Sequence, residues 1–145
     1  MNILVINGPN LNMLGIREQE LYGSGTLEDL MGMIKTEAER LGVLVSFLQS
    51  NSEGALVDAI QGAYGSMDGI IINPAAYTHT SVALLDALKA VGLPTVEVHL
   101  TNPHDREDFR KTSYIRAACL ETITGRGFAG YVSALRLLVD HLDEA

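Results

Sequence analysis

The sequence predicts an α/β fold in which helices cover both faces of a doubly wound, five-stranded parallel sheet. Five short apolar segments alternate with amphipathic segments along the 145 residues, which is the pattern of repeated strand–helix–strand units. The segment GIIIN at residues 69–73 lacks polar alternation, as expected for a strand buried on both faces. Residues 128–142 repeat apolar side chains at helical spacing, which indicates a helix with one buried face.

The first strand is predicted at residues 2–7, and a long loop follows it. The segment NILVIN is apolar and ends at Gly8. The polar stretch that follows runs to about residue 25. Loops longer than about 12 residues without secondary structure are usually functional lids or disordered segments. We therefore expect this loop to do more than connect two elements.

A helix, a strand and a second helix are expected next. Thr26 is placed to cap the first of these helices, with Asp29 three residues on as a variant of the capping box, and Gly42 ends the helix. Residues 43–49 are predicted to form the second strand. Ser52 then begins the second helix.

The second half of the chain repeats this alternation. We predict the third strand at residues 69–73, a helix at about 81–91 and the fourth strand at 95–99. Residues 105–114 are ambiguous and contain at most one short helical turn, and residues 120–124 resemble a fifth strand before the terminal helix. Crossovers between parallel strands are right-handed. For five strands the common doubly wound order is the flavodoxin-like 2-1-3-4-5.

Composition indicates one domain, residues 1–145, of an ordinary globular protein, with 47% hydrophobic and 19% charged residues. A net charge of −8 argues against a nucleic-acid partner. Cys119 is the single cysteine, so no internal disulfide forms, which suits a reducing compartment. No apolar run reaches the roughly 20 residues of a membrane span, and the N-terminus lacks the basic region of a signal peptide. We expect a cytoplasmic protein without a membrane partner.

Polar residues gather where the strands end. In doubly wound sheets, ligands bind beyond the carboxyl ends of the strands. The polar residues predicted there are Asn7 and Asn10 after the first strand, Asn73, Tyr77 and His79 after the third, and Glu97, His99, Thr101, Asn102, His104, Arg106 and Arg110 around the fourth. Neither GxGxxG nor GxxxxGK[ST] follows the first strand, which argues against a dinucleotide or P-loop site.

Glu97 and His99 lie two residues apart at the end of the fourth strand. Alternate residues of a strand share one face, so the two side chains can meet. A carboxylate bonded to one imidazole nitrogen fixes the tautomer, directs the other nitrogen outward and favours the protonated ring. This pair is typical of a general acid. It is equally compatible with a structural role in which two buried polar groups satisfy each other.

The long loop after the first strand offers a candidate base. It contains Arg17 and Tyr22. Ionising an isolated tyrosine at pH 7 costs about 4 kcal/mol, and one or two neighbouring guanidinium groups would remove much of that cost. The alternative is that Tyr22 only anchors the loop by packing.

Other chemistries are less well supported by the residue pattern. His79, His99 and His104, with Glu97 or Asp105, are candidate zinc ligands, but none shows compact spacing such as HExxH. A site without metal is therefore favoured. No GxSxG motif is present, and Ser81 suits a helix cap. Two rival functions stay open, namely a non-catalytic module that binds a carboxylate ligand and a metal-assisted hydrolase.

Several motifs, in order along nearly the whole chain, resemble the type II 3-dehydroquinate dehydratases. These are NGPNLNMLGIRE, ELYG, QSNSEG, INPAAYTHTS with ALLDAL, EVHLTN with HDREDFR and SYI, and GFAGY. The resemblance implies a flavodoxin-like fold and the dehydration of 3-dehydroquinate to 3-dehydroshikimate in the shikimate pathway. It also implies an anti elimination through an enolate, without a cofactor, in a homododecamer built from four trimers.

The resemblance also implies a role for each matching residue. Tyr22 would remove the C2 proton, and Arg17 would favour its ionised form and close the lid. Asn10 would help to stabilise the enolate, and His99, oriented by Glu97, would protonate the departing hydroxyl. The residues that would bind the substrate are Asn73, His79, Leu100, Thr101 and Arg110, with Asp86 approaching the site of a neighbouring subunit, while Arg106 would hold the structure around the site.

The chain departs from the family pattern at two places. Ala75 and Ala76 stand where at least one glycine is expected after Asn-Pro. Pro103 and Asp105 replace the small apolar residues that usually flank His104, and Asp105 adds negative charge near the expected anion site.

Overall fold

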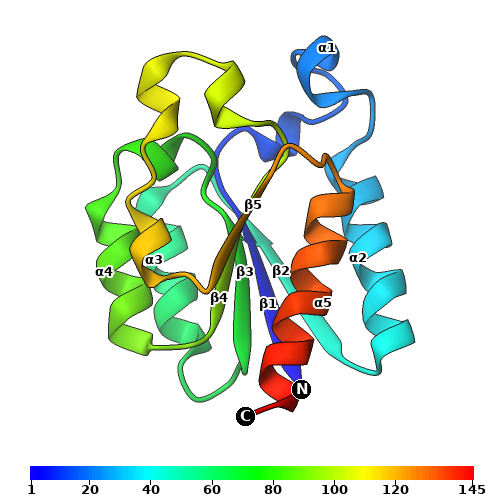
Figure 1. Ribbon diagram of the computed structural model, residues 1–145, viewed down its shortest axis with the longest axis vertical. Helices are drawn as coiled ribbons and strands as arrows, with labels where there is room; N and C mark the ends of the chain where they lie inside the picture. Colours follow the sequence, from blue (N-terminus) through cyan, green and yellow to red (C-terminus); the bar gives the residue numbers. More distant parts are fainter.

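The computed structural model describes residues 1–145 and places five parallel strands in one sheet (Figure 1). The strands are β1 (Asn2–Asn7), β2 (Leu44–Gln49), β3 (Gly69–Asn73), β4 (Thr95–His99) and β5 (Glu121–Thr124). Their order is β2-β1-β3-β4-β5, and every neighbouring pair is parallel. This confirms the predicted flavodoxin-like sheet and its strand order.

Two pairs of helices cover the two faces of the sheet (Figure 1). One face carries α2 (Leu27–Leu41) and α5 (Ala129–Asp143), and the other carries α3 (Glu53–Ala63) and α4 (Val82–Val91). None of these helices is both long and apolar enough to cross a membrane.

The central strands are buried on both sides, as the absence of polar alternation predicts. Ile71 packs into the apolar layer beneath α2 and α5, whereas Ile70 and Ile72 pack into the layer beneath α3 and α4. All three side chains are fully buried. Burial of this kind stabilises the fold by about 1.5–3 kcal/mol for each large apolar side chain, and it holds the carboxyl ends of β1, β3 and β4 side by side.

The helices begin where the sequence predicts. The Asp29 backbone N–H donates to Thr26 Oγ1 at 3.1 Å, and the Thr26 N–H donates to Asp29 Oδ2 at 3.0 Å, which is a reciprocal capping box. Ser52 caps α3 and Ser81 caps α4 through their hydroxyl oxygens. The capping role of Ser81 agrees with its exclusion as a nucleophile.

Two irregular segments contain short helices. The loop after β1 includes a 3-10 turn, Leu11–Met13, and the short helix α1, Gln19–Tyr22, neither of which the sequence predicted. The ambiguous region 105–114 contains one 3-10 turn, Asp108–Lys111, and a second turn that was not predicted, Pro103–Asp105, comes directly before it. Such turns are too short to show an apolar period. Both segments lie beyond the carboxyl ends of the strands (Figure 1).

Gly8 allows the loops after β1 and β3 to touch. Its N–H donates to the carbonyl oxygen of Asn73 at 2.8 Å. A Cβ atom at this position would lie 2.4 Å from the carbonyl oxygen of Pro74, far inside any normal contact. Glycine is therefore required here for the two strand ends to approach each other.

Candidate active site

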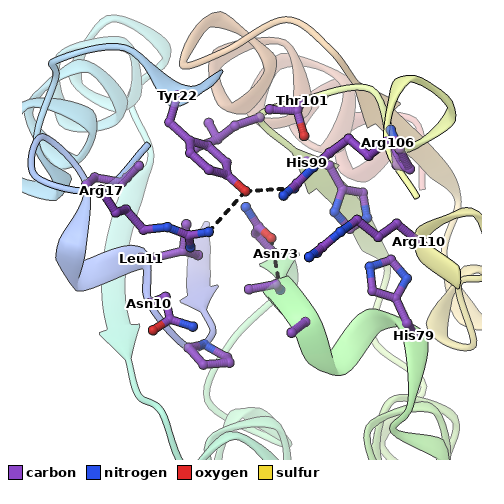
Figure 2. Close-up of a pocket in the computed structure, with 16 residues that line it drawn as sticks. Asn10, Leu11, Arg17, Tyr22, Asn73, His79, His99, Thr101, Arg106 and Arg110 are labelled. Atoms are coloured by element: carbon purple, nitrogen blue, oxygen red, sulfur yellow. Dashed lines mark hydrogen bonds between the residues drawn. The ribbon is translucent and has the colours of Figure 1, made fainter. Parts of the chain in front are cut away.

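A polar cavity opens at the carboxyl edge of the sheet, and most of the predicted site residues line it (Figure 2). The predicted residues among its lining are Asn10, Arg17, Tyr22, Asn73, His79, His99, Leu100, Thr101 and Arg110. Glu97 lies behind His99 and is fully buried. Asp86 is exposed on α4 and does not line this cavity.

Glu97 holds His99 at the end of β4, as the strand periodicity predicts. His99 Nε2 lies 2.5 Å from Glu97 Oε2. Ser113 Oγ donates to the same carboxylate oxygen at 2.8 Å, and Thr122 Oγ1 donates to the other at 3.1 Å. Burial acts to raise the pKa of Glu97, but the hydrogen bond and charge of His99 and the bond from Ser113 outweigh it, so the pKa lies below its ordinary value.

This arrangement assigns the two nitrogens of His99. Because Nε2 is bonded to an ionised carboxylate, it carries a proton. Nδ1 has no hydrogen-bond partner within the chain, and His99 lines the cavity. A protonated His99 can therefore deliver the Nδ1 proton to a ligand while Glu97 balances the charge.

The Tyr22 hydroxyl lies between two guanidinium groups (Figure 2). Arg106 Nη1 donates to it at 2.8 Å, and Arg17 Nη2 lies 3.4 Å from the same oxygen. The guanidinium carbons are 4.6 Å (Arg17) and 5.6 Å (Arg106) from the centre of the Tyr22 ring. Two positive charges beside the phenol oxygen stabilise a negative charge on it. The shorter contact, from Arg106, was not predicted from the sequence.

The opposite wall of the cavity carries His79 and Arg110 (Figure 2). His79 Nδ1 lies 2.7 Å from the Thr112 carbonyl oxygen, which can only accept, so Nδ1 donates and Nε2 is left as an acceptor. Burial is the main cause that lowers the pKa of His79, with further contributions from nearby positive groups. Arg110 is also paired with Glu107 at 2.6 Å.

The charge of the cavity suits an anionic ligand. Arg17, Arg106 and Arg110 line it, whereas no carboxylate does. Asp105, which adds negative charge in the sequence, is exposed and outside the lining, although its neighbour Pro103 contributes to the wall. An organic carboxylate bound here would meet three guanidinium groups, of which Arg17 is paired with Glu18 at 2.7 Å and Arg110 with Glu107 at 2.6 Å, both carboxylates lying outside the lining.

Cys119 and His141 lie away from this chemistry. Cys119 lies outside the cavity, and burial raises the pKa of its thiol to about 12, so the thiol stays protonated at neutral pH. His141 is exposed in the last turn of α5. No group of three or more His, Cys, Asp or Glu side chains is close enough together to hold a metal ion.

Ala75 is one of the two positions, with Ala76, at which the family pattern predicts at least one glycine. Its φ is 53°, in the left-handed region, and its N–H donates to Asn73 Oδ1 at 3.0 Å. A left-handed conformation costs a residue with a Cβ atom about 1–2 kcal/mol. The neighbouring Ala76 has no such conformation.

Ala75→Gly is therefore expected to stabilise the protein by about 0.5–1 kcal/mol, because the relief of strain exceeds the added freedom of the unfolded chain. Thermal unfolding at fixed protein concentration should show a midpoint higher by about 2–4 °C. The matched control is Ala76→Gly, which should lower the midpoint or leave it unchanged. Equal shifts for the two variants would refute the strain at Ala75.

Comparison with known proteins identifies the family of the chain. Residues 1–139 match the family model described as dehydroquinase class II. The chain is 51% identical to a 3-dehydroquinate dehydratase from Clostridium acetobutylicum, over 99% of this chain and all of that protein. It is 54% identical to a 3-dehydroquinate dehydratase from Geotalea daltonii, over 98% of this chain and 99% of that protein.

A solved structure is similar as well. The crystal structure of type II dehydroquinase from Butyrivibrio crossotus superposes with a TM-score of 0.94 at 48% identity, and the match covers 96% of this chain and 97% of that chain. Family model, sequence relatives and structure all cover nearly the full length. The chain therefore belongs to the class II dehydroquinase family.

Proposed function

We propose that the protein is a hydro-lyase that dehydrates 3-dehydroquinate to 3-dehydroshikimate in the shikimate pathway, with Tyr22 as base and His99 as acid. Family membership supports the reaction. The observation that carries the assignment of roles is the pairing within one cavity. A phenol held by two guanidinium groups and an imidazole held by a buried carboxylate both line it.

The first step is removal of the C2 proton. The Tyr22 phenolate takes the proton, the C2–H bond breaks, and its electrons move to the C3 carbonyl oxygen to give an enolate. Arg106 and Arg17 stabilise the phenolate before transfer. Asn10, on the loop after β1, helps to stabilise the enolate oxygen, and such oriented donors contribute about 10²–10³-fold to the rate.

The second step is loss of the C1 hydroxyl. The enolate electrons re-form the carbonyl and a C1–C2 double bond while the C1–O bond breaks. His99 donates its Nδ1 proton to the departing oxygen, which leaves as water. Glu97 orients the ring and balances the charge of the imidazolium beforehand. Anti elimination follows if Tyr22 and His99 act from opposite sides of the substrate ring.

The remaining lining residues bind the substrate in this proposal. Arg110 and the Leu100 and Thr101 backbone contact its carboxylate and hydroxyls, and the His79 Nε2 lone pair accepts from one hydroxyl. Asn73 donates to another. The cationic lining supports this assignment, because 3-dehydroquinate carries one carboxylate.

Spectrophotometry tests the proposed reaction. Purified protein mixed with 3-dehydroquinate should give the ultraviolet absorbance of the new conjugated enone, at a rate that added EDTA does not change. Saturable binding without an absorbance change would indicate a non-catalytic binding module instead. Loss of activity after exhaustive chelation would indicate a metal-assisted enzyme.

The contact of Arg106 with Tyr22 predicts that removing the Arg106 side chain lowers kcat. Arg106→Ala should lower kcat by about 10–100-fold, because a hydrogen bond to a charged group contributes about 1.5–3 kcal/mol. Arg126→Ala is the matched control, since Arg126 is exposed and outside the cavity. Steady-state kinetics with 3-dehydroquinate gives kcat for both variants. Equal activity of the two would contradict a role for this contact in catalysis.

We further propose a cytoplasmic homododecamer of four trimers, in which Asp86 of one subunit approaches the cavity of the next. The exposed position of Asp86 on α4 is compatible with such a contribution. Twelve copies of the 15.6 kDa chain give roughly 187 kDa. Light scattering coupled to size exclusion should give this mass, and a monomer mass in the active protein would overturn the assembly.

A further inference from the structure

A buried chain of hydrogen bonds joins α5 to the ends of β1 and β3. Tyr131, in the first turn of α5, is fully buried. Its hydroxyl donates to Asn7 Oδ1 at 2.6 Å and accepts from Asn73 Nδ2 at 2.9 Å. Asn73 Oδ1 in turn accepts from the Ala75 N–H at 3.0 Å. Asn7 and Asn73 are directly paired neighbours in the sheet.

One backbone group determines which atom donates and which accepts in every bond of this chain of hydrogen bonds. The Ala75 N–H can only donate, so the atom of Asn73 that it meets must be the oxygen. The other end of the Asn73 amide must then be the nitrogen, which donates to the Tyr131 oxygen. The Tyr131 hydrogen is left for Asn7 Oδ1. Burial raises the pKa of Tyr131, so the hydroxyl keeps this hydrogen at any physiological pH.

The fixed orientation of the Asn73 amide determines which of its groups can bond to a ligand. One N–H of its amide is bonded to Tyr131, and the second has no acceptor within the chain. Asn73 lines the cavity (Figure 2). Without the Tyr131 hydroxyl, the amide nitrogen would lose its buried acceptor and the side chain would be free to reorient.

We propose that Tyr131 is a positioning residue that, together with Asn7, fixes the Asn73 amide so that Asn73 donates to a hydroxyl oxygen of the bound substrate. This inference rests on the proposed function, and it extends the site to a residue that never touches the substrate. Removing the Tyr131 hydroxyl should therefore weaken substrate binding only through its effect on Asn73, and it should leave the chemical step intact.

The first test is Tyr131→Phe, which removes one oxygen and keeps the ring in the core. KM for 3-dehydroquinate should rise roughly tenfold with kcat nearly unchanged. Without its buried acceptor the Asn73 amide is free to reorient, so it holds the substrate hydroxyl less well. Tyr64→Phe is the matched control, since Tyr64 is 72% exposed and makes no side-chain hydrogen bond. Its KM should equal that of the wild type.

A double-mutant cycle separates positioning from general destabilisation. In an Asn73→Ala background, Tyr131→Phe should cause no further rise in KM, because the group it positions is gone. If the two effects on kcat/KM multiply instead, Tyr131 does not act through Asn73 and the inference is overturned. Asn7→Ala, at the far end of the same chain, gives a second cycle with the same expected result, so the test stands even if Tyr131→Phe fails to fold.

The outcome also separates this inference from the proposed function. Wild-type protein that gives no enone from 3-dehydroquinate would overturn the function itself. Wild-type turnover combined with multiplying effects in the cycles would overturn only the role of Tyr131.

Discussion

Replacing Tyr22 by phenylalanine is expected to lower kcat by about 10³–10⁴-fold, the upper part of the range for a general base. The cavity lining contains no carboxylate, and its two imidazoles are bonded to Glu97 and to the Thr112 carbonyl. The free His79 Nε2 is assigned to binding a substrate hydroxyl, which leaves Tyr22 as the group proposed to take the C2 proton. KM should change little, because the phenyl ring keeps its position beneath the Arg17 and Arg106 guanidinium groups.

Enone formation from 3-dehydroquinate measures this loss directly. Tyr64→Phe removes the same atom from an exposed ring and should behave as the wild type. Thermal unfolding of both variants checks that the fold is retained. Near-normal turnover by Tyr22→Phe would show that another group is the base.

The second large effect is expected at His99. His99→Ala removes the proton that assists departure of the C1 hydroxyl, so kcat should fall by about 10²–10⁴-fold. Unlike Tyr22→Phe, this variant still contains the base and should still form the enolate. Steady-state kinetics gives the loss, and His141→Ala, an exposed imidazole in the last turn of α5, is the control.

Glu97→Gln distinguishes the role of the carboxylate from that of the ring. The amide keeps the shape but removes the charge that stabilises the imidazolium, so the loss in kcat should be smaller than for His99→Ala. It should also cost stability, since an amide cannot accept from His99, Ser113 and Thr122 through two oxygens. An unchanged kcat in Glu97→Gln would show that the Glu97–His99 pair has only a structural role.

The sequence predicts most of this fold because the relevant signals are local. The strands at 2–7, 69–73 and 95–99 were predicted with the bounds that the structure has. Burial on both faces leaves an uninterrupted apolar run, which periodicity detects. The short helices after β1 and the turn Pro103–Asp105 after β4 were missed, because each spans only three or four residues and no apolar stripe accompanies it.

The site was predictable where strand periodicity or a motif fixes the geometry. The Glu97–His99 contact follows from two-residue spacing on one strand. The contacts of Arg106 with Tyr22 and of Thr122 with Glu97 join segments 84 and 25 residues apart. Only the folded chain brings such residues together, so no spacing in the sequence reveals them.

Exchange of the C2 proton in D₂O, followed by proton NMR of 3-dehydroquinate, tests the division of labour between Tyr22 and His99 most directly. His99→Ala is expected to exchange this proton for deuterium faster than it forms product, because the base still produces the enolate but the acid is gone. Tyr22→Phe is expected to do neither. Exchange at the wild-type rate in Tyr22→Phe would contradict the central assignment.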